Sequence, residues 1–238
     1  MKSISELKVK IFADGANKAG MLEMYGKPYI HGLTTNPTLM RQAGINDYPA
    51  FAKDILCAIP DRPISFEVFA DEFDEMERQG HEIAGWGNNV YVKIPVTNTR
   101  GESSADLVRA LSSRGIKLNV TALMSVRQVE EITDALDTGT PSFVSVFAGR
   151  VADTGRDPVP LMVDALHVLR ANPLAELIWA SPRELLNIFQ ADAIGCHVIT
   201  VTNDILKKLC FIGKDLDEFS LDTVQMFHRD AETAGFRL

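Results

Sequence analysis

Cysteine is scarce in this sequence, and its few copies form no pattern. Cys57, Cys196 and Cys210 are far apart along the chain, with no Cys-x-x-Cys pair among them. Three scattered thiols make no even disulfide framework, which favours reduced cysteines in a cytoplasmic protein. The five histidines are equally isolated. Because zinc sites use His and Cys ligands at short, characteristic spacings, we predict no metal site.

Basic residues are fewer than acidic ones, and long apolar runs are missing. The chain has 24 Lys and Arg against 32 Asp and Glu, which gives a formal net charge of −8. An acidic surface repels phosphate backbones and anionic headgroups, so we expect binding neither to nucleic acid nor to a membrane. No apolar segment approaches the length that spans a bilayer, and no apolar signal region follows Lys2.

No stretch rich in Pro, Gly or Ser separates two domains. Instead, short apolar runs with many β-branched residues alternate with helix-compatible segments along all 238 residues. The predicted strands are residues 9–14, 29–35, 64–70, 89–96, 117–122, 143–149, 175–181 and 197–201. The predicted helices include residues 71–84, 104–114, 125–136, 158–170, 183–193 and 216–234.

Eight strands alternating with helices over this length predict a single-domain (β/α)8 barrel, or TIM barrel, spanning residues 1–238. An open, doubly wound sheet is the alternative, but no Gly-x-Gly-x-x-Gly turn follows the first strand. We expect one extra C-terminal helix at about residues 215–235, with an apolar stripe from Phe219 to Phe227. That stripe is typical of a helix that contacts another subunit or packs on its own barrel.

One predicted strand carries a charge where charge is costly. Residues 89–96 read Asn-Val-Tyr-Val-Lys-Ile-Pro-Val, which is typical of a strand buried on both faces. Lys93 lies in its middle, flanked by apolar residues that give its stem no exposed face. A lysine that reaches water from a strand end is the ordinary explanation. Desolvation instead favours the neutral amine, which is the form that attacks a carbonyl to make a Schiff base.

Further polar residues fall near the C-terminal ends of the predicted strands, where TIM barrels carry their active sites. Two are carboxylates: Asp14 ends the first strand and Glu67 lies within the third. Taken singly, most of these residues have ordinary explanations as caps, turns or solvated charges. Together they predict one site at one end of the barrel. The other candidates are Thr35, Asn36, Asn119, Thr121, Ser145, Phe147, Arg150, Ser181 and Arg183.

Five segments, in order along the chain, resemble the transaldolase family. Gly32-Leu33-Thr34-Thr35-Asn36-Pro37-Thr38 resembles its N-terminal signature, and residues 92–97 are similar to its active-site lysine strand. Three further family blocks are matched by residues 118–121, 145–150 and 180–183. The resemblance extends from Asp14 to about Val201. The length resembles the short branch of the family, which includes fructose-6-phosphate aldolase.

This resemblance implies a TIM barrel that needs no cofactor, because a lysine provides the electron sink. Lys93 would attack the ketose carbonyl, and Asp14 would act as acid and base on the C4 hydroxyl. Glu67, with Thr121, would hold a water that carries protons while the imine forms and hydrolyses. Two carboxylates in different environments are suited to such a division of proton transfers.

The resemblance also implies sugar phosphates as the partners of the site and a homo-oligomer as the assembly. The dihydroxyacetone hydroxyls would be bound by Asn36 and Asn119, with Thr35 and Ser145 beside them. Arg150, Ser181 and Arg183 would bind the phosphate of the acceptor, since the forked donors of arginine match an anion of that shape.

Three positions bear on which member of the family this chain resembles. Phe147 looks like the transaldolases, whereas a tyrosine there looks like the aldolases. Pro182 and Val146 depart from the usual Phe and Pro on the acceptor side, so a sulfonated sugar is an alternative to the phosphate ester. The alternative activities are an aldolase that releases dihydroxyacetone and a phosphosugar isomerase or epimerase. A barrel that only binds sugar phosphates is a further alternative.

Overall fold

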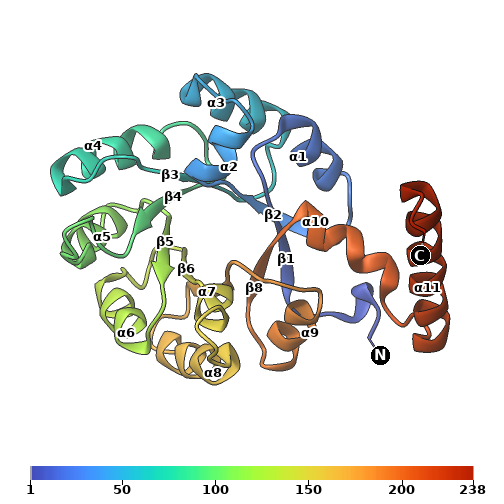
Figure 1. Cartoon of the computed structure of the whole chain (residues 1–238). Coiled ribbons are helices and arrows are strands. Elements are labelled where there is room, and N and C mark those ends of the chain that lie inside the picture. Colours follow the sequence, from blue (N-terminus) through green and yellow to red (C-terminus); the bar gives the residue numbers. More distant parts are fainter. Residues whose placement is uncertain (1, 238) are drawn as a thin grey trace.

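The computed structural model describes residues 2–237, and its centre is a closed barrel of eight parallel strands (Figure 1). The strands pair in chain order, and β1 pairs with β8 to close the barrel. The predicted TIM barrel is therefore confirmed. The strands are β1 (Lys10–Asp14), β2 (Ile30–Thr34), β3 (Ile64–Glu67), β4 (Val90–Pro95), β5 (Leu118–Leu123), β6 (Ser142–Val146), β7 (Ala175–Trp179) and β8 (Val198–Thr202).

Helices surround the barrel on its outside, except for the last one, which lies apart from it (Figure 1). They are α1 (Lys18–Tyr25), α2 (Pro37–Gln42), α3 (Tyr48–Ala58), α4 (Phe73–Ala84), α5 (Ala105–Ser112), α6 (Val126–Ala135), α7 (Ala148–Ala152), α8 (Pro158–Leu169), α9 (Leu186–Ala193), α10 (Asn203–Leu206) and α11 (Leu216–Ala234). Short 3-10 turns, η1 (Ile4–Glu6) and η2 (Lys207–Phe211), precede β1 and follow α10.

Strands β3 and β6 each end three residues earlier than the sequence predicts. Strand β6 ends at Val146, and the next residues begin the short helix α7, which the sequence analysis missed. The apolar run across this boundary has the composition of a strand, so composition alone extends it too far. Strand β3 ends at Glu67. The N–H of Val68 still donates to the Lys93 carbonyl at 3.1 Å, but those of Phe69 and Ala70 leave the sheet and donate to the Gln79 side chain at 2.8 and 3.1 Å.

The interior of the barrel is filled by apolar side chains, and polar side chains gather at the C-terminal ends of its strands. Phe12 and Phe143 meet edge to face inside it, with ring centroids 5.5 Å apart. Gly32 leaves room for them, since a Cβ atom there would lie 2.6 Å from the Phe12 ring. Because alternate residues of a strand share a face, Asp14 lies on the same face as Phe12, one layer higher. The polar residues of the mouth therefore rest on a packed apolar floor.

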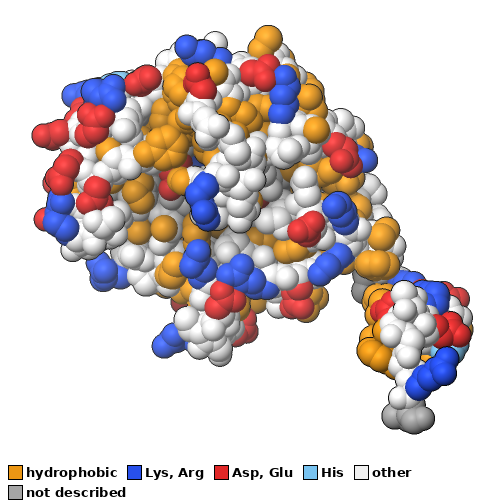
Figure 2. Space-filling model, turned by 45° about the horizontal axis from the view of Figure 1, so that its top comes forward, with side chains coloured by type: hydrophobic (Ala, Val, Ile, Leu, Met, Phe, Trp, Pro, Cys, Tyr) orange, Lys and Arg blue, Asp and Glu red, His pale blue; other side chains and the backbone are white. Residues whose placement is uncertain are grey.

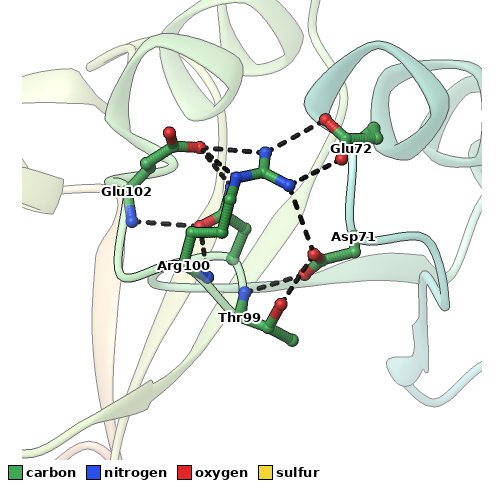
Figure 3. Close-up of polar contacts among 6 residues, drawn as sticks. Asp71, Glu72, Thr99, Arg100 and Glu102 are labelled. Carbon is green, nitrogen blue, oxygen red and sulfur yellow. Dashed lines mark hydrogen bonds and ion pairs between the residues drawn. The ribbon is translucent and has the colours of Figure 1, made fainter.

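Arg100 joins two loops at the mouth (Figure 3). It comes from the loop after β4, and its guanidinium contacts Glu72 at 2.6 Å and Glu102 at 3.0 Å, with Asp71 at 3.6 Å. In the same loop, the backbone N–H of Thr99 donates to the Asp71 carboxylate at 2.7 Å. These contacts connect the segment after β3 to the segment after β4, the two strands that carry Glu67 and Lys93.

The last helix, α11, lies apart from the barrel (Figures 1 and 2). It buries none of its residues, although Leu221, Val224 and Phe227 are apolar and more than half exposed. Only its first turns are attached, where Phe219 stacks on Phe211 with ring centroids 5.2 Å apart. Packing of this helix on its own barrel, one of the two alternatives drawn from the sequence, is therefore wrong. Within residues 2–237, no helix is long and apolar enough to cross a membrane.

Candidate active site

A cavity of about 440 Å³ opens at the C-terminal end of the barrel. Its walls come from strands and loops that are remote in sequence, because all eight parallel strands deliver their C-terminal ends to this face. Eleven of the twelve predicted site residues line it: Asp14, Asn36, Glu67, Lys93, Asn119, Thr121, Ser145, Phe147, Arg150, Ser181 and Arg183. Thr38, Gln42, Thr200 and Thr202 also line it, and the sequence analysis had given them no role.

Lys93 is buried, with 6% of its surface exposed, as the sequence predicts. Its amine is not isolated, however. Nζ lies 3.0 Å from Oε2 of Glu67 and donates to the backbone carbonyl of Thr35 at 2.7 Å. The register of β3 on β4 aligns Glu67 with Lys93, so the two side chains emerge side by side. The Glu67 carboxylate offsets the cost of placing an ammonium inside the barrel.

Asp14 is the second carboxylate of the cavity. Burial raises its pKa above the ordinary value of 3.8, and the nearby Glu67 carboxylate acts in the same direction. Lys93 and a hydrogen bond from Thr34 at 2.8 Å oppose this rise without reversing it. The Thr34 hydroxyl also contacts that of Thr200 at 2.5 Å. A carboxyl group with a raised pKa, facing a cavity, is suited to gain and lose a proton during catalysis.

Asn119 and Ser145 form a fixed polar layer beside Lys93. The Ser145 hydroxyl donates to Oδ1 of Asn119 at 2.7 Å, and Nδ2 of Asn119 donates to the Ser65 hydroxyl at 2.9 Å. All three residues are buried. These bonds fix the orientation of the Asn119 amide and leave one of its N–H groups for a ligand. Asn36 is similar, because its Oδ1 caps α2 by accepting from the backbone of Leu39 at 3.0 Å.

Thr121 is the one cavity residue whose buried hydroxyl has no hydrogen-bond partner within residues 2–237. Its neighbour Ala122 adopts a φ of 66°, where the pairing of β5 with β6 is irregular. The left-handed region costs an alanine roughly 1–2 kcal/mol, so the rest of the structure enforces this conformation. A buried hydroxyl without a partner beside a cavity indicates a place for a water or a substrate oxygen.

The opposite wall carries the two arginines. Arg150 lies in α7, with its guanidinium carbon 6.0 Å from the centre of the Phe147 ring. Arg183 pairs with Asp153 through two hydrogen bonds, and this pairing lowers the pKa of Asp153 below its ordinary value. Asp153 could not be predicted from the sequence, because only the fold brings it to Arg183.

Ser181 reaches the cavity in a strained conformation, with a φ of 60°. The neighbouring position 149 must be glycine, because a Cβ atom there would lie 1.6 Å from the Ser181 carbonyl oxygen. The close approach of these two backbones holds the turn after β7 against α7. It therefore holds Ser181 and Arg183 on the same side of the cavity as Arg150.

Thr35 is the predicted site residue that the structure does not place in the cavity. Its side chain is completely buried and donates to the Ser65 carbonyl at 2.9 Å, so only its backbone carbonyl contacts the site. The sequence predicts Thr35 as a substrate-binding residue, but its side chain points away from the cavity and its backbone carbonyl accepts from Lys93. Thr34 faces the cavity in its place. Strand alternation contains this signal, since Gly32, Thr34 and Asn36 share one face and Thr35 points the other way.

The fold and the cavity define a class: a TIM-barrel protein with a lysine and two carboxylates at the C-terminal mouth. Comparison with known proteins makes this class specific. The model of the family described as transaldolase/fructose-6-phosphate aldolase matches residues 11–238. The chain therefore belongs to the transaldolase/fructose-6-phosphate aldolase family.

Individual relatives agree with this assignment. A probable transaldolase of Dehalococcoides mccartyi is 33% identical over 84% of this chain and 90% of its own length. A probable transaldolase of Clostridium acetobutylicum is 36% identical over 84% of this chain and 89% of its own. A solved structure described as KGPDC from Streptococcus mutans has a TM-score of 0.58 and 9% identity, covering 85% of this chain and 90% of that one. At that identity, the likeness shows the fold alone.

The raised pKa of Asp14 gives a prediction for stability. A carboxyl whose pKa is higher in the folded state destabilises the fold wherever it is ionised, and this cost vanishes once both states are protonated. Asp14→Asn should therefore raise the free energy of unfolding at pH 7. The gain should shrink as the pH falls through the folded-state pKa toward 3.8. Urea unfolding at several pH values measures it, with the exposed Asp230→Asn as the control for losing one charge. A gain that stays constant down to pH 3 would contradict it.

Proposed function

We propose that this protein is a Schiff-base transaldolase that moves a dihydroxyacetone unit from a ketose phosphate to an aldose phosphate. The observation that supports this most is the pairing of a buried lysine with one carboxylate in a cavity that contains a second one. An imine-forming lysine needs a proton acceptor at its nitrogen, and carbon–carbon cleavage needs a separate base at a hydroxyl. Glu67 and Asp14 fill these two positions.

In the first step, Glu67 takes the third proton of the Lys93 ammonium, 3.0 Å away. The free amine then bonds to C2 of the ketose. The carbonyl oxygen leaves as water after receiving two protons, one from Nζ and one returned by Glu67. The unpartnered Thr121 hydroxyl is suited to hold the departing or returning water. The product is an iminium that still carries one N–H.

In the second step, the Asp14 carboxylate removes the proton of the C4 hydroxyl. The C3–C4 bond breaks, its electrons move into the iminium to give an enamine, and the aldose phosphate leaves with its new carbonyl. Transfer reverses these events on another aldehyde, with Asp14 returning the proton to the new alkoxide. The buried environment that raises the pKa of Asp14 brings it nearer to the working pH of such a base.

Binding follows from the remaining groups of the cavity. Asn36 and Asn119, each through a side-chain N–H, and the Ser145 hydroxyl would bind the hydroxyls of the dihydroxyacetone unit. Across the cavity, Arg150, Ser181 and Arg183 are placed to bind the anionic end of the acceptor. The Asp153 partner of Arg183 orients that guanidinium before a substrate arrives.

Lys93→Met tests the mechanism directly. The variant should fold, because the unbranched methionine fills the buried channel of the lysine, and it should lose turnover completely. Sodium borohydride with fructose 6-phosphate should add a reduced three-carbon unit to the wild-type peptide that contains residues 92–96. Mass spectrometry locates the adduct, and Lys117→Met is the control. An adduct on Lys117, or on no lysine, contradicts the mechanism.

Arg183→Ala tests the anion site. Losing one charge-assisted hydrogen bond to a bound phosphate costs roughly 1.5–3 kcal/mol. KM for a phosphorylated acceptor should therefore rise roughly tenfold or more, with little effect on an acceptor without phosphate. Arg156→Ala, in the exposed loop after α7, is the control. Equal losses with both acceptors would mean that Arg183 supports the fold and does not bind the anion.

Transfer, as opposed to release, depends on Phe147. Release of dihydroxyacetone requires a water at C2, and the Phe147 ring lines the cavity without offering such a water a hydrogen bond. Phe147→Tyr should shift the ratio toward release with little change in stability. The assay is dihydroxyacetone formation from fructose 6-phosphate with and without an aldose phosphate. Rapid release by the wild type, unaffected by acceptor, would make the protein an aldolase.

The proposed setting of this enzyme is the cytoplasm, and its proposed assembly is a homo-oligomer. Its three cysteines are free thiols, which agrees with a reducing compartment. The exposed apolar face of α11 supports contact with another copy, because an isolated amphipathic helix gains most of its stability from packing. Val224→Glu combined with Phe227→Glu should reduce the mass found by light scattering, while Arg229→Glu on the polar face should not. An unchanged mass in the double variant would exclude α11 from the contact.

A further inference from the structure

The pairing of β2 with β3 is short, and this affects Lys93. Only Leu33 with Ile64 and Thr34 with Ser65 are in register across this seam. The ladder continues for one more bond, from the backbone N–H of Thr35 to the Ser65 carbonyl at 3.2 Å. In a parallel pair, the next bond runs from the N–H of Glu67 to the carbonyl of Thr35. That bond is absent, although all of these residues are described.

A side chain from outside the barrel replaces the missing bond. The backbone N–H of Glu67 donates to the Tyr48 hydroxyl at 2.8 Å, and that hydroxyl donates to the Glu67 carbonyl at 3.1 Å. The Thr35 carbonyl, released from the ladder, accepts from Nζ of Lys93 at 2.7 Å. One phenol hydroxyl thus satisfies both backbone groups of Glu67, while the carbonyl opposite is left for the lysine.

Tyr48 is held firmly enough to do this. It is the first residue of α3, next to the helix cap Asp47. Its ring packs against Phe66, Phe69 and Trp86, with centroids 6.1, 4.6 and 5.2 Å away. Burial raises the pKa of the phenol, which keeps its donor proton.

We propose that Tyr48 is a positioning residue for Lys93: its hydroxyl keeps the β2–β3 seam open so that the Thr35 carbonyl orients the lysine amine. This rests on the proposed function of Lys93 as the imine-forming residue. After Glu67 takes the third ammonium proton, the amine has two N–H groups and one lone pair. The Thr35 carbonyl accepts one of those N–H groups, while the now protonated Glu67 lies beside the lone pair that gave up the proton. The contact with Thr35 limits the rotation of the amine about its Cε–Nζ bond, so the lone pair can turn from Glu67 toward C2 of the substrate while one N–H stays bonded.

The test is Tyr48→Phe, which keeps the aromatic packing and removes only the hydroxyl. Without it, the Glu67 N–H regains Thr35 as its acceptor, the seam closes, and the amine loses one of its two contacts. When a reacting atom is held away from its productive position, the rate falls by roughly tenfold to a hundredfold. We expect that loss in kcat and in the rate of borohydride trapping on Lys93 by fructose 6-phosphate, with little change in KM.

A ligand without a carbonyl separates positioning from a loss of fold. Binding of a polyol phosphate such as glucitol 6-phosphate, measured by calorimetry, should be nearly unchanged in Tyr48→Phe, since it needs no amine. The matched control is Tyr25→Phe, which removes a phenol bonded to Asp61 at 2.7 Å on the outer surface. That variant should trap at the wild-type rate.

The outcomes are distinct. Trapping by Tyr48→Phe within twofold of the wild type would overturn the inference. A trapping rate and polyol affinity that fall together with thermal stability would also overturn it, because Tyr48 would then only support the fold. Formaldehyde with borohydride probes the same amine without any sugar. If the wild type shows no ketose adduct but Lys93 is methylated more slowly in Tyr48→Phe, the proposed function fails and the positioning stands. If Lys93 is methylated equally in both proteins, the positioning fails.

Discussion

The ion pair between Lys93 and Glu67 is the constraint around which the mouth of this barrel is built. A charge inside a protein needs a partner, and truncating either member of such a pair leaves the other charge buried alone. The register of β3 on β4 supplies the partner directly, because Glu67 and Lys93 are aligned neighbours on adjacent strands. The Arg100 contacts then tie together the loops that follow these same two strands. The buried lysine is therefore held between two strands whose following loops are also joined to each other.

The second carboxylate follows a different physical rule. Glu67 faces the Lys93 ammonium. For Asp14, burial is the larger influence, and it raises the pKa of this carboxyl despite the nearby ammonium. Two carboxylates in one cavity thus have different surroundings, and such a difference is how a single site divides acid and base roles. The hydroxyls of Thr34 and Thr200 continue from Asp14 as a short chain of hydrogen bonds, so the carboxyl keeps a polar partner in either protonation state.

Backbone strain marks the same mouth. Ala122 and Ser181 are the non-glycine residues with positive φ among those described, and both line the cavity. Strain persists only where the surroundings fix it, as the contact of Gly149 with the Ser181 carbonyl does. The missing ladder bond between β2 and β3 belongs with these features. In each case a regular hydrogen bond or backbone angle is given up beside the cavity.

The eightfold order of strands and helices, the burial of Lys93 and most of the residues that line its cavity could be predicted from the amino-acid sequence. This was possible because strand periodicity and composition are local, and because parallel strands must bring their C-terminal ends to one face. The sequence did not determine where β6 gives way to α7, since the same apolar residues suit either element. Thr35 was predicted to lie in the site, although the alternation of side chains along β2 turns Thr34, and not Thr35, toward the cavity. Only the tertiary structure brought Asp153 to Arg183 and Tyr48 to Glu67, and only it left α11 apart from the barrel. Those contacts join residues that are separated by 19 or more positions in the chain. No local pattern encodes such a contact, because its energy depends on the packing of every element between the two residues.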